Sequence, residues 1–221
     1  MPRGRPRAFD RDAALETAMT VFWRHGYDDT SISALTEAMG IASPSLYAAF
    51  GSKAALFCEA ADLYQRLDGA EPERRMRRRA NGRDAIEALL LANAELFTQR
   101  ERPHGCLLTL AAASYSGADA EVGAYLARTK RERIALIGAR LVEAERAGER
   151  LPPGDPALLA DYYDTVVQGL AVRAREGASR RRLREVVALA MASWPSGAAP
   201  TGEAPTGQAP TGQAPAGAPG R

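Results

Sequence analysis

The chain has 221 residues, of which 46% are hydrophobic, and its formal net charge is +2. This length allows one or two domains, and the apolar fraction is sufficient for a packed core. The nearly balanced charge excludes a uniformly positive surface, so any binding of nucleic acid must depend on local placement of charge.

Cysteine usage and apolar runs argue against further classes of protein. Cys58 and Cys106 have no paired spacing, which argues against a disulfide framework and a zinc site. The longest apolar runs, residues 88–92 and 186–192, are far too short to span a bilayer, and none follows the basic N-terminus. We therefore expect a cytoplasmic protein with no membrane partner, no metal and no cofactor.

Residues 1–8 form a basic arm. Glycine and proline alternate there with Arg3, Arg5 and Arg7, a pattern that cannot form a helix and resembles the core of an AT-hook. Arginines on an extended arm can enter a narrow minor groove, where the negative potential is enhanced. The alternative is a frayed, solvated terminus without a binding role.

Two helices are expected before residue 41. The first covers residues 10–25, where apolar side chains recur at helical spacing and Gly26 follows. The second begins at a cap made by Thr30 or Ser31, and Gly40 stands where a helix end needs a left-handed backbone. A turn of very few residues then leads into a third helix, which is the order of a helix-turn-helix.

The third helix carries the side chains expected to face DNA. Pro44 marks its first turn, where a missing amide hydrogen has no partner, and Ser43 is the expected cap. The outward residues are small and uncharged apart from one tyrosine: Ser43, Pro44, Ser45, Tyr47 and Ala48. Such a helix can lie deep in a major groove, which is about 12 Å wide. We expect Tyr47 to bind a phosphate and the other four to face base edges.

A phosphate clamp is expected where the next helix opens. Lys53 stands there beside the backbone amides of a helix N-terminus, which attract anions. Thr30, before the second helix, is a further candidate contact to DNA. The alternative for residues 30–53 is an ordinary helical hairpin with a polar side.

At these residues the chain resembles the TetR family of transcriptional regulators. The likeness runs from about residue 9 to residue 67 and includes Gly-Tyr, Thr-Ser, Leu-Tyr-x-x-Phe and Ser-Lys motifs. One departure is Ala42, where members of the family often carry a serine cap. The resemblance implies an all-α homodimer with an N-terminal three-helix domain that binds an operator in double-stranded DNA, and a C-terminal helical domain for dimerisation and an effector.

The domain boundaries follow from this resemblance and from composition. The DNA-binding domain is expected over residues 9–67, a linker over 68–82 and the C-terminal domain over 83–195. Helices of that domain are expected over residues 84–98, 106–115, 119–147, 155–176 and 179–193. Residues 196–221 repeat proline and glycine with little apolar bulk, so we expect them to be disordered.

The last two helices are expected to form the dimer. The helix over residues 155–176 has two adjacent apolar stripes, of which one serves the core and the other needs a partner. Gly169 allows close approach in a four-helix bundle between two copies. A two-fold dimer places its recognition helices about one DNA turn or slightly more apart, which predicts a near-palindromic operator.

The effector is expected in a mostly apolar pocket of the C-terminal domain. Candidate lining residues are aromatic or aliphatic, with one amide: Tyr64, Leu90, Asn93, Phe97, Tyr125, Tyr162 and Val166. Few such interior positions are charged, so a small lipophilic compound is expected, although each residue could merely fill the core. The effector would tilt the helix that joins Lys53 to Tyr64 and release a repressor from its operator.

Three alternatives remain open. Cys106 is either a small apolar residue at the start of a buried helix or a sensor of oxidants or electrophiles. An enzyme is disfavoured, because the chain has two histidines and no phosphate loop or nucleophile elbow, and we assign no catalytic residue. An architectural DNA binder is disfavoured, because the C-terminal part is larger than dimerisation requires.

Overall fold

The computed structural model describes residues 9–195 of the chain. The predicted basic arm with Arg3, Arg5 and Arg7, and the Pro/Gly-rich segment 196–221, lie outside this part. Every regular element among the described residues is helical, as predicted. None of these helices is long and apolar enough to cross a membrane.

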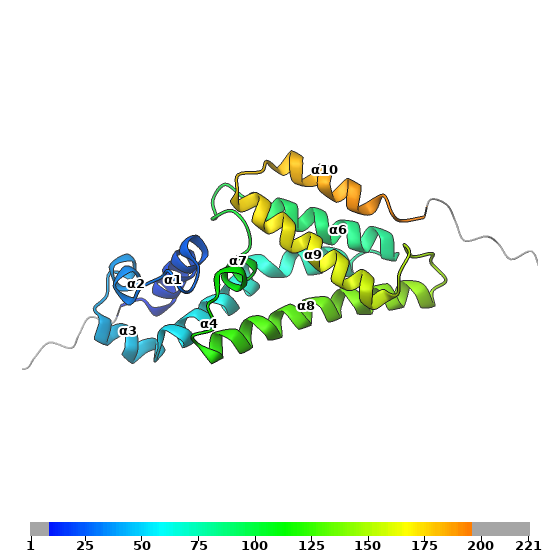
Figure 1. The fold of residues 1–221 in the computed structure, drawn as a ribbon. Helices are drawn as coiled ribbons and strands as arrows, with labels where there is room; N and C mark the ends of the chain where they lie inside the picture. Colours follow the sequence, from blue (N-terminus) through cyan, green and yellow to red (C-terminus); the bar gives the residue numbers. More distant parts are fainter. Residues whose placement is uncertain (1–8, 196–221) are drawn as a thin grey trace, which may run out of the picture.

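Three helices form a compact unit at one end of the molecule (Figure 1). They are α1 (Arg11–His25), α2 (Ile32–Met39) and α3 (Ser43–Phe50). Asp10 and Ser31 cap α1 and α2 by accepting from backbone amides, and Gly40 ends α2 with a φ of 64°. The succession of α2, a tight turn and α3 confirms the predicted helix-turn-helix.

The start of α3 differs from the expected one. The N-cap is Ala42, which makes no side-chain hydrogen bond, and Ser43 is the first helical residue rather than the cap. Pro44 is therefore the second helical residue, where its missing amide hydrogen still has no intrahelical acceptor. The hydroxyl of Ser43 is consequently left on the surface without a capping role.

One continuous helical path joins the two halves of the molecule. The helix α4 (Lys53–Tyr64) passes into a π-helical turn, η1 (Gln65–Gly69), and then into α5 (Ala70–Arg77). The region predicted as a linker, residues 68–82, is therefore largely helical. Pro72 lies in the first turn of α5 and does not break the path, although it removes one amide donor that would otherwise bond to a carbonyl of the preceding turn.

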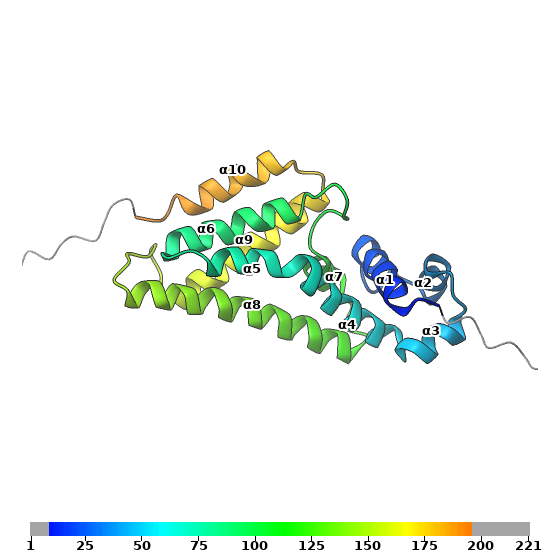
Figure 2. The same cartoon turned by 180° about the vertical axis from the view of Figure 1, so that it is seen from behind.

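The C-terminal helices form a bundle against α5 and the end of α4 (Figures 1 and 2). They are α6 (Gly82–Leu96), α7 (Leu107–Ser114), α8 (Ala120–Arg146), α9 (Pro156–Arg175) and α10 (Arg180–Met191). Their ends differ from the predicted ones by at most two residues. α9 packs between α6 and α8, and α10 covers α6 and α9 on one side.

Aromatic side chains fill the junction between α1 and α4. The rings of Phe22 and Phe57 meet edge to face at 5.2 Å between centroids, and those of Trp23 and Tyr64 at 4.7 Å. All four side chains are buried in one core that extends into the C-terminal bundle. These packed rings leave little room for α4 to move independently of α1.

Candidate DNA-binding surface and effector cavity

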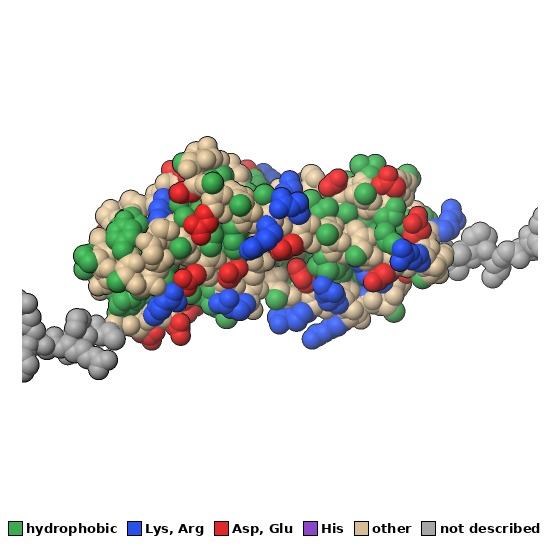
Figure 3. Space-filling view, turned by 90° about the horizontal axis from the view of Figure 1, so that it is seen from below, with side chains coloured by type: hydrophobic (Ala, Val, Ile, Leu, Met, Phe, Trp, Pro, Cys, Tyr) green, Lys and Arg blue, Asp and Glu red, His purple; other side chains and the backbone are tan. Residues whose placement is uncertain are grey.

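The outer face of α3 carries the residues predicted to face DNA. Ser43, Pro44, Tyr47 and Ala48 are exposed, whereas Ser45 is half-buried. Figure 3 shows that this end of the molecule is covered mainly by hydrophobic and uncharged atoms, while acidic and basic side chains are interspersed over the rest of that face. Small, uncharged outward side chains allow this helix to lie deep in a major groove, which is wide enough to admit one helix.

Thr30 does not belong to this surface, which corrects the prediction. Its exposed fraction is 1%, and its hydroxyl donates to the carbonyl oxygen of Gly26 at 2.6 Å. Thr30 therefore joins the start of α2 to the end of α1 and cannot reach DNA. Ser31 is the residue that caps α2, by accepting from the amide of Ala34.

Lys53 follows α3 closely, as the first residue of α4. It is half-buried, and its Nζ lies 4.3 Å from the centroid of the Tyr27 ring. Burial lowers the pKa of Lys53, against the opposing effect of Asp28 and other nearby carboxylates. The ring holds the ammonium group beside the helix N-terminus. A phosphate contact by Lys53 remains a prediction, as does that by Tyr47.

A cavity of about 290 Å³ opens in the C-terminal domain beside η1. Of the predicted lining residues, Tyr64, Asn93 and Phe97 lie in its wall, together with Cys106. The wall also includes residues of η1, α5, α8 and α9. Within residues 9–195, no group of three or more His, Cys, Asp or Glu side chains is arranged to hold a metal ion.

The other predicted lining residues lie elsewhere. Leu90 is fully buried in the core, and Tyr162 keeps 43% of its surface exposed on α9. Val166 is half-buried outside the cavity, and its neighbour Val167 takes its place in the wall. Adjacent helical residues differ in direction by about 100°, so a shift of one position changes which side chain meets the cavity.

Tyr125 supports the wall without being part of it. Its hydroxyl donates to Asp62 at 2.6 Å and accepts from Nε2 of Gln65 at 2.9 Å. Burial raises the pKa of Tyr125 well above its usual value, and the carboxylate of Asp62 raises it further. Tyr125 thus fixes Gln65, which does line the cavity.

The cavity is more polar than predicted, because Glu73, Arg77, Glu132 and Arg133 contribute to its wall. The Nε of Arg133 donates to Oδ1 of Asp164, whose exposed fraction is 1%. Arg133 is the last residue of the charged run 128–133 on α8. Because a helix turns each successive residue by about 100°, the side chains of this run cannot all face solvent.

The cavity is connected to α1 by a short chain of contacts. The hydroxyl of Tyr64 donates to Sγ of Cys106 at 3.5 Å, and burial raises the pKa of Tyr64 well above its usual value. The Trp23 ring packs on Tyr64, and its Nε1 donates to the carbonyl oxygen of Gly105 at 3.3 Å. No pattern in the sequence indicated this connection, which joins residues 82 positions apart.

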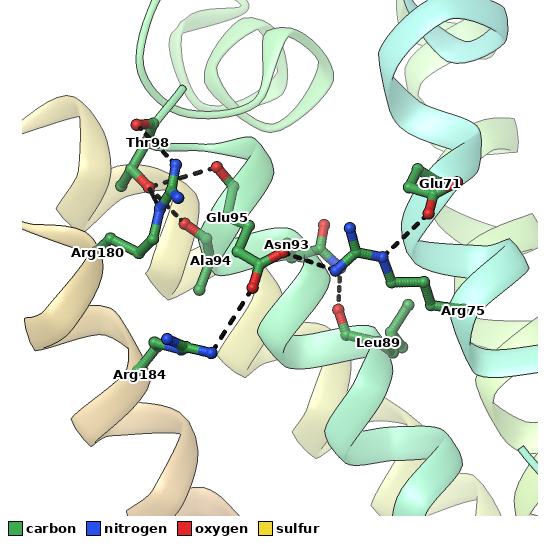
Figure 4. Close-up of polar contacts among 9 residues, drawn as sticks. All are labelled: Glu71, Arg75, Leu89, Asn93, Ala94, Glu95, Thr98, Arg180 and Arg184. Atoms are coloured by element: carbon green, nitrogen blue, oxygen red, sulfur yellow. Dashed lines mark hydrogen bonds and ion pairs between the residues drawn. The ribbon is translucent and has the colours of Figure 1, made fainter. Parts of the chain in front are cut away.

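A network of ion pairs holds α5 and α10 to another face of α6 (Figure 4). Glu95 accepts from Arg75 at 2.6 Å and lies 3.7 Å from Arg184, and Arg75 also donates to Glu71 at 3.0 Å. Partly exposed pairs contribute little singly, but a network fixes the relative positions of its helices. Among the basic residues of α5, Arg75 therefore helps to fix the position of α5 on α6.

A stripe of large apolar side chains on α9 and α10 is exposed: Leu158, Tyr162, Val172, Val186 and Leu189. Leu189 keeps 77% of its surface and Leu158 keeps 60%. The adjacent stripe on α9, which includes Leu159 and Leu170, is buried. The predicted double stripe is confirmed, and the outer one is suited to a second copy of the chain.

An exposed helix-turn-helix, a cavity joined to it by one helical path, and an unpartnered apolar stripe define a regulatory DNA-binding protein. Residues 14–60 match the family model described as bacterial regulatory proteins of the tetR family. The HTH-type transcriptional repressor ComR of Escherichia coli (strain K12) is 33% identical over 194 residues, which cover 87% of this chain and 92% of ComR.

Two further comparisons support the same assignment. The repressor BdcR of Escherichia coli (strain K12) is 27% identical over 199 residues, or 85% of this chain and 90% of BdcR. A structure of a cysteine mutant of the TetR family regulator CifR, complexed with operator DNA, has a TM-score of 0.80 and 41% identity and covers 86% of this chain and 100% of that chain. The chain belongs to the TetR family of transcriptional regulators.

Proposed function

We propose that this protein is a repressor that binds a near-palindromic operator as a homodimer and leaves it when an effector fills the cavity. The observation that carries the proposal is the continuous path from α4 through η1 to α5. Lys53 begins this path beside α3, and Tyr64, Gln65 and Gly69 line the cavity farther along it. Two relatives, ComR and BdcR, are transcriptional repressors, and the structure of a cysteine mutant of CifR is a complex with 26 bp operator DNA.

Two routes connect the effector to the DNA-binding surface. The first is α4 itself, which the effector would tilt at Tyr64. The second runs from Cys106 and Gly105 to Trp23 in α1. Coupling between two sites is typically about 1–3 kcal/mol, which would lower operator affinity roughly 5- to 150-fold. Operator DNA must then weaken effector binding by the same factor.

Selection of bound sequences from random DNA tests the proposal, followed by a gel shift with DNA upstream of the protein's own gene. A dimer with two identical α3 helices should select an inverted repeat whose half-sites lie about one DNA turn or slightly more apart. Selection of a single unrepeated half-site, or of no motif, would contradict it.

Replacing Lys53 with alanine should weaken binding to all DNA sequences about equally. A phosphate contact carries no sequence information, so the slope of log affinity against log salt should fall by about 1. The measurement is a salt series of binding isotherms with operator and unrelated DNA. Lys130→Ala on the exposed side of α8 is the matched control and should change neither. A change in sequence preference for Lys53→Ala would mean that its side chain faces a base.

A second candidate function is a sensor of electrophiles, favoured by the position of Cys106 in the cavity wall beside Tyr64. Under this candidate, iodoacetamide should release the wild-type protein from operator DNA but not the Cys106→Ser variant. Cys58→Ser is the control and should respond as wild type does, because burial raises the pKa of Cys58 to about 11 and keeps it protonated. Equal release of wild type and Cys106→Ser, in a gel shift, would eliminate this candidate.

A further inference from the structure

One buried charge pair lies at the boundary between the cavity and α9. Arg133 on α8 keeps 21% of its side chain exposed, and its partner Asp164 on α9 keeps 2%. A buried pair seldom stabilises a fold more than apolar residues of the same volume would, because both charges lose their hydration. The pair therefore needs an explanation other than stability.

The hydrogen bonds of Asp164 use both of its oxygens within the protein. Oδ1 accepts from Nε of Arg133, and Oδ2 accepts from Nε2 of Gln168 at 2.6 Å. Within residues 9–195, neither terminal nitrogen of Arg133 makes a hydrogen bond, and Arg133 lines the cavity. Asp164 thus holds the guanidinium plane of Arg133 through Nε. The two terminal nitrogens of Arg133 stay available to a bound molecule, and their spacing matches the two oxygens of a carboxylate.

The remaining wall suits the body of a small organic acid. Phe97, Leu108, Leu136 and Val167 supply apolar surface. Nδ2 of Asn93 donates to the carbonyl oxygen of Leu89 at 2.9 Å (Figure 4), which leaves Oδ1 as an acceptor. A carboxylate between Arg133 and apolar walls would follow the usual design of small-molecule sites, with few polar groups placed to orient the ligand.

Two acidic residues of the wall limit the charge of the ligand. Glu132 keeps 65% of its side chain exposed and pairs with Arg128, and Glu73 is half-buried on α5. Arg77, an exposed residue of the wall on α5, offsets one of these carboxylates. The wall then presents one partly buried cation, Arg133, which matches a single negative charge better than the two charges of a phosphate ester. The arrangement favours a monoanion.

We propose that the effector is a small monocarboxylate with an apolar body, whose carboxylate binds the terminal nitrogens of Arg133. The inference rests on the proposed function, since it names the chemical class that the cavity would recognise. It narrows the small lipophilic compound expected from the sequence to a carboxylic acid.

Calorimetric titration of the full chain with acid–amide pairs tests this recognition. The probes are hexanoate, octanoate, benzoate and phenylacetate, each compared with its primary amide. At least one acid should bind at least tenfold more tightly than its amide, because only the acid pairs with Arg133. Equal binding of acid and amide in every pair, or no binding of any acid at millimolar concentration, would overturn the proposal.

Variants test whether Arg133 causes the preference for acids over amides. Arg133→Gln alone would leave Asp164 buried without its charged partner, so the test uses Arg133→Gln combined with Asp164→Asn. This double variant should bind the preferred acid at least tenfold more weakly, whereas Arg131→Gln on the exposed side of α8 should bind it as wild type does. Unchanged binding by the double variant would refute the role of Arg133. The acid–amide comparison needs no variant and decides the question even if the double variant does not fold.

Operator binding without a probe is measured separately by gel shift. A protein that prefers acids but binds no operator would contradict the proposed function and leave the carboxylate site intact. A protein that binds operator but shows no preference for acids would contradict only the inference drawn from Arg133.

Discussion

Replacing Leu158 and Leu189 together with glutamate is expected to convert the protein to a monomer with little affinity for its operator. Both side chains belong to the exposed apolar stripe on α9 and α10. In a two-fold interface each substitution occurs twice, so four buried carboxylates would replace four buried leucines. Burying unpaired charge costs far more than the lost apolar contacts.

The loss of operator affinity should be at least about 100-fold, because a dimer gains its second half-site at a high effective concentration. Analytical ultracentrifugation and gel shifts at the same protein concentration measure the two effects. Leu67→Glu is the matched control, since Leu67 is 50% exposed but lies on η1, and it should leave the dimer intact. A double variant that sedimented as a dimer would place the interface elsewhere.

Replacing Gly105 with alanine is expected to destabilise the fold by about 2–4 kcal/mol. Gly105 has a φ of 90°, which costs a residue with a Cβ about 1–2 kcal/mol. An added Cβ would also lie 2.9 Å from the carbonyl oxygen of Ala171 in α9, which is backbone and cannot rotate away. The loop would have to move, and its hydrogen bonds with Phe97 and Trp23 would weaken.

Gly117→Ala separates the cost of the positive φ from the cost of the steric clash. Gly117 also has a φ of 90°, but an added Cβ there would meet nothing within 4 Å. Urea unfolding at a fixed protein concentration should therefore show a loss of only about 1–2 kcal/mol for Gly117→Ala and a larger one for Gly105→Ala. Equal losses would mean that the loop before α7 moves away from α9 without cost.

Local signals in the sequence predicted the helices well. Asp155 and Ser179 cap α9 and α10 by accepting from backbone amides, and residues of their type are common at such positions. The choice between Thr30 and Ser31 was harder, because adjacent hydroxyls have the same capping chemistry. Only their three-dimensional positions show that Thr30 faces Gly26 and is buried.

The cavity was less predictable than the helices around it. Periodicity indicates which side of a helix is buried, but not whether that side meets another side chain or an empty space. Leu90 and Asn93 both lie on buried positions of α6, yet only Asn93 reaches the cavity. The inward turn of Arg133 is compensated by Asp164, which lies 31 positions later in the chain, and spacing does not encode such a pairing.

The π-helical turn η1 determines how far the N-terminal helices are rotated about the axis of α4 relative to the C-terminal bundle. Each α-helical residue advances a helix by about 1.5 Å and about 100°, whereas a π turn bonds each residue to one that is five positions away. Gln65–Gly69 therefore accommodates one extra residue. In a regular α-helix the same extra residue would rotate α3 about the axis of α4, relative to the C-terminal bundle. A relative with one residue fewer between Lys53 and Arg77 needs only a regular α turn at this point. Its recognition helix would then face the same direction about the axis of α4 as it does in this protein. Insertions and deletions in this family should therefore be tolerated at η1 and penalised elsewhere along α4.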